Sequence, residues 1–261
     1  MACDIHPTAL VDPGVELGAD VVIGPYSIIE DDVVIGDRTR IDSHVVIGRH
    51  TRIGQENHVF HGAAVGLIPQ DLKFQGEKTF LCIGDRNIIR EFCTINRGTK
   101  ARGETLIGNN CAILAYCHIA HDCVIGDHLI VSNSLAMAGH VHVGNHVTIG
   151  GVCSFHQFTS IGDHVMIQAT CYVSQDVVPF ALVGAEPVRI VDVNKIGLER
   201  RGFSPGRIQA IRRAYRTLFR DNLNLEDALV KLNSEHSDNG DIAQIVLFAR
   251  SSTRGILRMQ Q

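Results

Sequence analysis

The chain has 261 residues, of which 45% are apolar, and a formal net charge of −4 at pH 7. This size fits one large or two modest domains. The net negative charge argues against a nucleic-acid partner, because proteins that bind nucleic acids usually carry an excess of basic residues. The sequence has no run of about eighteen apolar residues and no signal-peptide pattern at its start, so we expect a cytoplasmic protein without an integral membrane segment.

A six-residue repeat runs through most of the chain. Counting in sixes from Ile5 to Val173 meets an apolar residue at every step except Asp71 and Glu77. At many of these steps the aliphatic residue is followed by glycine, and the aliphatic members of those pairs are Leu17, Ile23, Ile35, Ile47, Ile53, Val65, Ile83, Ile107, Ile125, Val143, Ile149 and Ile161.

This period predicts a parallel β-helix in which each short strand sends one aliphatic side chain into a prism. Three strands form a coil of eighteen residues, and residues 5–173 then supply roughly nine to ten coils. Successive coils are expected about 4.8 Å apart. We expect the glycine after each aliphatic residue to give the backbone the freedom that a sharp corner needs. The period itself leaves the handedness open.

Seven of the eight cysteines share one phase of the repeat, four residues after the aliphatic position. Small residues fill the same phase elsewhere, so we predict buried inward side chains and neither disulfides nor a metal cluster. A protected inward thiol is also a poor nucleophile, which argues against catalysis by Cys117 or Cys123. The cysteines in this phase are Cys3, Cys93, Cys111, Cys117, Cys123, Cys153 and Cys171.

Two stretches near 67–79 and 98–104 interrupt the repeat and are predicted to be protruding loops with a binding role. Helix signals begin after about Pro187, including an N-cap at Ser204 before Pro205. We therefore predict a β-helix over 1–188 and a helical C-terminal domain over 189–261. The first long helix carries arginines that form either a solvated face or a dock for an acidic partner. These are Arg207, Arg212, Arg213, Arg216 and Arg220.

The segment around His121 has the residues for acyl transfer. Counting eighteen residues from His121 gives Gly139, and eighteen more gives Gln157, so the three are expected to stack on adjacent coils. His121 then offers a general base, the Gly139 N–H an oxyanion donor, and Asp122 a group that fixes the imidazole tautomer. His140 and His156 add polarity beside this column.

Several motifs resemble those of the UDP-N-acetylglucosamine O-acyltransferase family of hexapeptide-repeat enzymes. They are Pro69-Gln-Asp-Leu-Lys-Phe, Ile88-Ile-Arg-Glu, Arg97-Gly-Thr, His118-Ile-Ala-His-Asp-Cys, Ala138-Gly-His, His156-Gln-Phe, Gln175-Asp-Val and Arg200-Arg-Gly-Phe-Ser. The resemblance implies a left-handed β-helix and a homotrimer with active sites between subunits. It also implies transfer of a 3-hydroxyacyl chain from acyl carrier protein to the 3-OH of the UDP-sugar, the first step of lipid A biosynthesis, without a cofactor or metal.

The resemblance also implies roles for individual residues. His121 is the general base, Asp122 its partner and Gly139 the oxyanion donor. The sugar and acyl sites would be lined by Gln70, Asp71, Lys73, His118, His140, His156 and Gln157; the nucleotide would meet Asn194 and Arg200; the acyl length would be measured by Met166, Gln168 and Ala169. The sequence departs from the family pattern at three places: Asn96 stands where a histidine is expected, Ile196 stands where an acid is expected, and the pair Gln168-Ala169 is unfamiliar at the positions that measure acyl length.

Three alternatives remain open at this point. The acceptor could carry a 3-amino group, which would make the product an amide. A zinc-dependent enzyme of the carbonic anhydrase type uses the same prism with histidines between subunits, and His142 and His146 would be its ligands here. A non-catalytic scaffold would lose no activity when His121 is changed.

Overall fold

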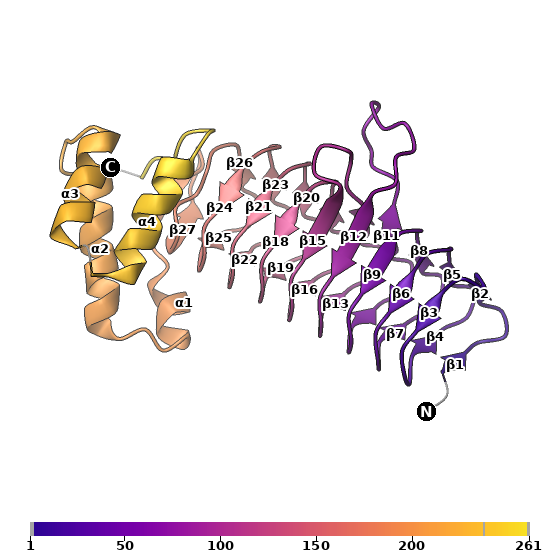
Figure 1. Cartoon of the computed structure of the whole chain (residues 1–261). Helices are drawn as coiled ribbons and strands as arrows, with labels where there is room; N and C mark the ends of the chain where they lie inside the picture. The colour runs from indigo at the N-terminus through magenta and orange to yellow at the C-terminus, as the bar shows by residue number, and fades with distance from the viewer. Residues whose placement is uncertain (1–2, 237, 260–261) are drawn as a thin grey trace.

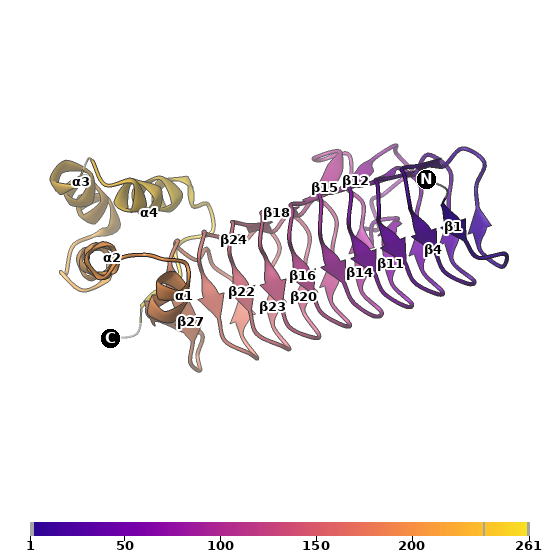
Figure 2. The same cartoon turned by 90° about the horizontal axis from the view of Figure 1, so that it is seen from below.

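The computed structural model describes residues 3–236 and 238–259, which form a left-handed parallel β-helix with a group of helices at its C-terminal end (Figure 1). The fold class predicted from the repeat and the resemblance is confirmed. Three sheets form the sides of the prism, and their strands lie side by side from coil to coil (Figure 2). Corner 1 joins the first sheet to the second, corner 2 joins the second to the third, and corner 3 returns from the third to the first.

The strands are short, and up to β27 consecutive strands belong to different sheets, whereas β27 and β28 pair antiparallel within the first sheet. The first sheet contains β1 (Asp4–Ile5), β4 (Val22–Ile23), β7 (Arg40–Ile41), β10 (His58–Val59), β13 (Ile88–Ile89), β16 (Ala112–Ile113), β19 (Ile130–Val131), β22 (Thr148–Ile149), β25 (Met166–Ile167), β27 (Ala181–Gly184) and β28 (Arg189–Val193). The second contains β2 (Leu10–Val11), β5 (Ile28–Ile29), β8 (Val46–Ile47), β11 (Ala64–Leu67), β14 (Thr94–Asn96), β17 (His118–Ile119), β20 (Ala136–Met137), β23 (Ser154–Phe155) and β26 (Tyr172–Val173). The third contains β3 (Glu16–Leu17), β6 (Val34–Ile35), β9 (Thr51–Ile53), β12 (Phe80–Ile83), β15 (Glu104–Ile107), β18 (Val124–Ile125), β21 (His142–Val143) and β24 (Ser160–Ile161).

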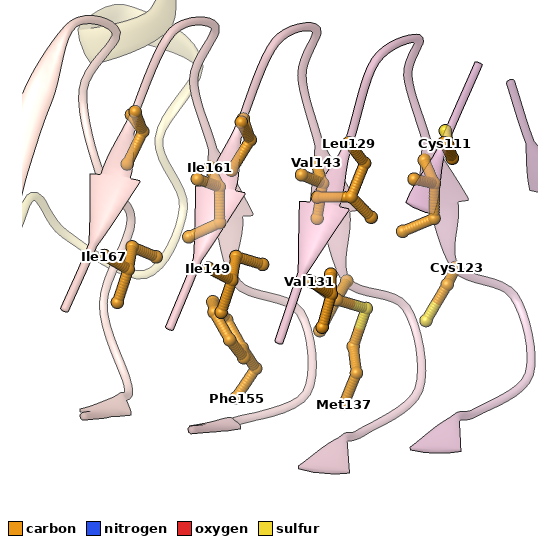
Figure 3. Packing of buried hydrophobic residues seen from close by; sticks show 14 of the residues in the cluster. Cys111, Cys123, Leu129, Val131, Met137, Val143, Ile149, Phe155, Ile161 and Ile167 are labelled. Atoms are coloured by element: carbon orange, nitrogen blue, oxygen red, sulfur yellow. The ribbon is translucent and has the colours of Figure 1, made fainter. Parts of the chain in front are cut away.

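The aliphatic positions of the repeat form the core of the prism. Ile119, Met137 and Phe155 are partners in consecutive strands of the second sheet, and all three are buried. Figure 3 shows such inward side chains stacked from coil to coil. Because the register is direct, residues eighteen apart in an uninterrupted coil occupy equivalent places, and this property positions the site described below.

The glycines after the aliphatic residues have a different role from the one predicted. Among them only Gly66 has a positive φ. In most corners the left-handed conformation occurs two residues after the glycine and is held by residues with side chains, such as Arg38 and His50. Glycine is needed for close approach instead, because a Cβ at Gly36 would lie 2.6 Å from the backbone of Gly54 in the next coil. The prediction that these glycines give the backbone the freedom needed at the corners was therefore wrong.

The inward placement of the cysteines is confirmed. All eight are free, and six of the seven in the shared phase are buried. Cys123 donates from Sγ to the Ala138 carbonyl at 3.3 Å, so the thiols also bond to the following coil. Burial raises the pKa of Cys111 to about 11 and that of Cys123 to about 12, which keeps both thiols protonated near neutral pH.

Corner 3 carries a ladder of side-chain to backbone hydrogen bonds. The Asp85 N–H donates to Asn109 Oδ1 at 2.8 Å, and the Asn109 N–H donates to Asp127 Oδ1 at 2.7 Å. The same bond recurs from Asp127 to Asn145 and from Asn145 to Asp163. Each carboxylate or amide thus satisfies a backbone donor that the turn leaves unpaired.

Four helices follow β28: α1 (Lys195–Arg200), α2 (Pro205–Phe219), α3 (Leu225–Glu235) and α4 (Gly240–Ser251). Tyr215 of α2 is buried and donates from its hydroxyl to the Pro179 carbonyl at 2.5 Å, while Gln244 of α4 donates to Asp163 at 2.7 Å. These bonds attach the helices to the last coils. The first sheet continues to Val193, and the division of the chain at residue 188 stays a prediction. No helix within the described ranges is long and apolar enough to cross a membrane.

A column of stacked histidine rings lies at corner 3 where the prism meets the helices. His146 stacks on His164 with ring centroids 5.0 Å apart, and Phe180 continues the column at 5.7 Å. Burial lowers the pKa of His164 to about 4, and the positive charges of His146 and Arg201 act in the same direction. The neutral ring is therefore the form that fits this position.

This column predicts a loss of stability in mild acid. The unfolded chain binds a proton at His164 near pH 6.5, whereas the folded chain resists protonation down to about pH 4, so the free energy of unfolding falls as the pH drops through that window. We expect His164→Phe to reduce the difference in this free energy between pH 7 and pH 5 by about 1 kcal/mol, since solvent screens part of the effect. Urea unfolding of both proteins at the two pH values measures it, and equal differences would contradict it.

Candidate active site

Corner 2 brings the predicted column together. β17, β20 and β23 pair in direct register, so His121, Gly139 and Gln157 occupy equivalent places in three consecutive corners. His156 lies beside Gln157, and its Nδ1 bonds to the Gln157 carbonyl at 3.0 Å. His118 projects from the outward face of β17 in the coil that also carries His121.

His121 and Asp122 form a hydrogen-bonded pair. Nδ1 of His121 lies 2.8 Å from Oδ2 of Asp122, whose side chain is fully buried. Burial alone would raise the pKa of Asp122, but hydrogen bonds from His121 and Thr99 outweigh it and hold that pKa below its usual value. An ionised carboxylate only accepts hydrogen bonds, so the proton of a neutral His121 sits on Nδ1 and its Nε2 carries the lone pair.

Gly139 lies against the ring of His121. A Cβ at Gly139 would stand 2.6 Å from Cε1 and 2.9 Å from Nε2 of His121, so only glycine fits without moving the imidazole. Within residues 3–236 and 238–259, nothing accepts a hydrogen bond from the Gly139 N–H. A basic nitrogen and an unused backbone donor thus lie side by side.

Two further histidines border this pair. The His140 ring stacks on Phe158 with centroids 4.5 Å apart and lies edge-on to His121 at 5.2 Å. His118 bonds through Nδ1 to the Thr94 hydroxyl at 2.7 Å. Burial lowers the pKa of both His140 and His118, so both are neutral near pH 7 and are suited to hydrogen-bonding an uncharged sugar.

The loop between β11 and β12, residues 68–79, projects from corner 2 (Figure 1). Asn96 of β14 fastens its start, because the side-chain amide donates to the Ile68 carbonyl at 2.9 Å. Asn96 is one of the residues that depart from the family pattern, and this hydrogen bond is the contact that its side chain makes. The carboxylate of Asp71 is close enough to His140 to oppose the lowering of its pKa. Asp71 is therefore within electrostatic range of His140 in the same chain, and Gln70 and Lys73 lie near it on the loop.

The remaining predicted residues lie at other corners. Asn194 caps α1 and donates from Nδ2 to the His164 carbonyl at 2.8 Å, which places it at corner 3 together with the exposed Arg200. Met166 lies on the outward face of the first sheet, and the turn that follows it forms corner 1. That turn contains Gln168 and Ala169. A single chain does not bring these five residues next to His121.

One group of three side chains of metal-binding type lies within 4.8 Å in the described ranges: His121, Asp122 and His140. Both oxygens of Asp122 already accept hydrogen bonds, from Thr99 and from His121. Asp122 and His121 are thus accounted for as a hydrogen-bonded pair, and the His140 ring packs against His121 and Phe158. His142 and His146, the ligands of the zinc alternative, belong to no such group in the part of the chain that the structure describes.

Sequence reasoning missed three contributors to the site. Thr99 and Thr105 hold Asp122, and Phe158 stacks on His140. The signal for Phe158 was available, because it lies eighteen residues after His140 in the same column. Thr99 lies in the interrupted stretch 98–104, where counting in sixes does not tell which coil it contacts.

Two family models match the chain. A bacterial transferase hexapeptide model, described as six repeats, matches residues 14–49 and 104–134. A second model, described as domain 2 of UDP-N-acetylglucosamine O-acyltransferase, matches residues 176–257. The fold, the repeat and the helical end together define a hexapeptide-repeat transferase.

Individual relatives narrow this class. The chain is 49% identical to an acyl-[acyl-carrier-protein]–UDP-N-acetylglucosamine O-acyltransferase of Thiobacillus denitrificans and 52% identical to that of Paracidovorax citrulli, in both cases over 97% of this chain and 99% of the relative. The solved UDP-N-acetylglucosamine O-acyltransferase of Moraxella catarrhalis superposes with a TM-score of 0.95 at 42% identity, covering 97% of this chain and 99% of that one. The chain belongs to the family of acyl-[acyl-carrier-protein]–UDP-N-acetylglucosamine O-acyltransferases, which confirms the resemblance, and it is an acyltransferase.

Proposed function

We propose that this enzyme transfers a 3-hydroxyacyl chain from acyl carrier protein to the 3-OH of UDP-N-acetylglucosamine, in the cytoplasm and as the first step of lipid A biosynthesis. Family membership supports the substrates. The observation that carries the chemistry is the His121 ring, whose Nε2 is free to accept a proton beside the unused N–H of Gly139.

The geometry suits direct displacement. His121 Nε2 takes the proton of the sugar hydroxyl as that oxygen attacks the thioester carbonyl, and the carbonyl oxygen becomes an oxyanion that the Gly139 N–H stabilises. The tetrahedral intermediate collapses, the C–S bond breaks, and the thiolate of the carrier protein leaves with the proton held by His121. Asp122 stays ionised and stabilises the imidazolium during the step. No covalent enzyme intermediate is needed.

The experiment that tests this proposal is an acyl-transfer assay with a ladder of 3-hydroxyacyl carrier proteins. UDP-N-acetylglucosamine and its 3-amino analogue serve as acceptors, and mass spectrometry identifies the products. We expect an ester at the 3-position and a preference for one chain length. If an amide forms in preference to the ester, the natural acceptor is the 3-amino sugar and not the one that we propose. If the folded protein acylates neither sugar, the proposed function is wrong.

We also propose that three copies assemble around corner 1. An exposed column of rings follows this corner, with Tyr26 next to His44 at 5.0 Å and Phe92 stacked on Tyr116 at 5.3 Å. Tyr116 is 62% exposed and extends a continuous row of rings along the corner, and a contiguous exposed patch of this kind is typical of an interaction surface. The neighbouring outward faces carry further exposed apolar residues, namely Leu10, Ile28, Ile88, Ile130 and Tyr172.

This arrangement accounts for the residues that one chain leaves apart. If corner 1 of each prism points at a three-fold axis, the first sheet of one copy faces the second sheet of the next. Corner 2 of one copy then meets corner 3 of its neighbour, so Asn194 and Arg200 of the neighbour come to His121. Gln168 and Ala169 at corner 1 would lie deeper in the same cleft, where an acyl chain would be measured.

We expect Tyr116→Glu to convert the trimer to smaller species, because a carboxylate would be buried in the contact. Light scattering after gel filtration gives the mass. Leu247→Glu in α4 is the matched control, since Leu247 is also an exposed apolar residue but lies away from corner 1. A monomeric wild type, or a trimeric Tyr116→Glu protein, would contradict the assembly.

A further inference from the structure

The stretch between β14 and β15, residues 97–103, is an interruption of the repeat to which the proposed chemistry assigns no task. It forms a closed turn, in which the Gly103 N–H donates to the Thr99 carbonyl at 2.7 Å and the Gly98 N–H donates to the Phe80 carbonyl at 3.0 Å. A Cβ at Gly98 would lie 2.4 Å from the backbone N of Glu104, so the turn is packed tightly at its base.

The turn delivers two hydrogen bonds to Asp122 in the following coil. The Thr99 N–H donates to Oδ1 at 2.9 Å, and the Thr99 hydroxyl donates to Oδ2 at 2.7 Å. Thr99 is itself 6% exposed, so water does not compete for these bonds. With the bond from His121, the buried carboxylate accepts three hydrogen bonds, which is how a charge is tolerated away from solvent.

Thr105 holds the backbone of the same residue. Its hydroxyl accepts from the Asp122 N–H at 2.8 Å, and Asp122 has a positive φ of 60°. Residues with side chains take this conformation at many other corners too, and here the bond from Thr105 pairs the backbone N–H of Asp122. The two threonines therefore fix both ends of Asp122.

We infer that Thr99 is a positioning residue for the transfer reaction, acting through Asp122 on the orientation and tautomer of His121. This inference rests on the proposed function only for its kinetic consequences. Thr99 is buried, so it is not placed to contact substrate. Its two bonds orient Oδ2 toward His121 Nδ1, and they favour the ionised carboxylate because both are donated to it.

The titratable groups around this pair belong to three other parts of the chain. His118 projects from β17, and Asp71 belongs to the loop 68–79. His140 lies in the next coil, with its Nε2 3.6 Å from Oδ2 of Asp122. Cys123 adjoins Asp122 in the chain. None of these is changed by a substitution at Thr99, so a shift in the titration of Asp122 reports the loss of the Thr99 bond.

The test compares Thr99→Val, which keeps the shape and the N–H but removes the hydroxyl, with Thr99→Ser, which restores the hydroxyl. We expect Thr99→Val to lower kcat by about tenfold to a hundredfold with a small change in KM, and Thr99→Ser to recover most of it. Thr39→Val is the matched control, since the buried Thr39 hydroxyl donates to the Gly54 carbonyl far from the site.

Two further measurements separate positioning from a structural effect. In an Asp122→Asn background, Thr99→Val should cause no additional loss of kcat, since the charge through which Thr99 acts is gone. Carbon-13 NMR of the Asp122 carboxyl group should show a higher titration midpoint in Thr99→Val than in wild type. An additive loss in the double variant, or an unchanged midpoint, would overturn the inference.

The NMR measurement uses no substrate and therefore distinguishes the two proposals. A shifted midpoint in a protein that acylates neither sugar would leave the positioning role intact and remove the proposed function. If the wild type transfers the acyl chain, and Thr99→Val has full activity and an unshifted midpoint, the proposed function stands and the positioning role of Thr99 is wrong.

Discussion

Replacement of His121 by alanine is expected to lower kcat by about a hundredfold to ten-thousandfold, the usual contribution of a general base. The pair with Asp122 at 2.8 Å fixes which nitrogen of His121 is basic, and a Cβ at Gly139 would lie 2.9 Å from that nitrogen, so the unused Gly139 N–H is close by. KM should change little, because the ring acts mainly on the transferred proton. Steady-state acyl transfer with purified protein measures both constants.

The control for this variant is His6→Ala. His6 is exposed in the first coil and bonds to the Thr8 hydroxyl at 2.9 Å, so its loss changes a histidine without touching corner 2. Circular dichroism and gel filtration of both variants check that the prism is intact. If the His121→Ala protein keeps the kcat of wild type, His121 is not the general base. Another residue then has that role, or the chain is the non-catalytic scaffold.

Replacement of Gly139 by alanine is expected to reduce activity by about a hundredfold or more while the fold persists. The added methyl group would stand 2.6 Å from Cε1 of His121, so the imidazole must move away from the position set by Asp122. The same displacement separates the basic nitrogen from the Gly139 N–H, and both halves of the proposed chemistry are lost together. Kinetics with a fixed carrier-protein substrate measure the loss.

Gly240→Ala is the control. Gly240 is the first residue of α4, away from corners 1 and 2, and a Cβ there would meet no atom of the described residues within 4 Å. We expect this variant to keep wild-type kcat and stability. Full activity in Gly139→Ala would show that the ring tolerates displacement and that another group stabilises the oxyanion.

The repeat made much of this structure predictable. Because the coils stack in direct register, counting by eighteen from His121 identified Gly139 and Gln157 as neighbours, and the phase of the cysteines identified them as inward side chains. The same counting failed where the coil is interrupted. Asp71 of loop 68–79 comes within electrostatic range of His140, and Thr99 bonds to Asp122. Neither arrangement follows the period, so no pattern in the sequence signals them.

The role of the glycines was also beyond the pattern. A glycine is compatible with a positive φ or with close approach, and the sequence alone favours neither. The structure shows that residues with side chains take the strained conformation while glycines allow adjacent coils to come together. The division of residues between subunits likewise depends on contacts between copies, which a periodic pattern within one chain does not describe.

The ladder at corner 3 gives the prism a fixed unit of length. Each hydrogen bond of the ladder joins one coil to the next. In related chains that keep these bonds, the distance from loop 68–79 to the helical end can therefore differ only by whole coils of about 4.8 Å. Any finer adjustment of reach, such as the difference between two acyl chains of neighbouring length, has to come from single side chains projecting at a corner. Divergence among such enzymes is therefore expected as substitutions within a constant number of coils.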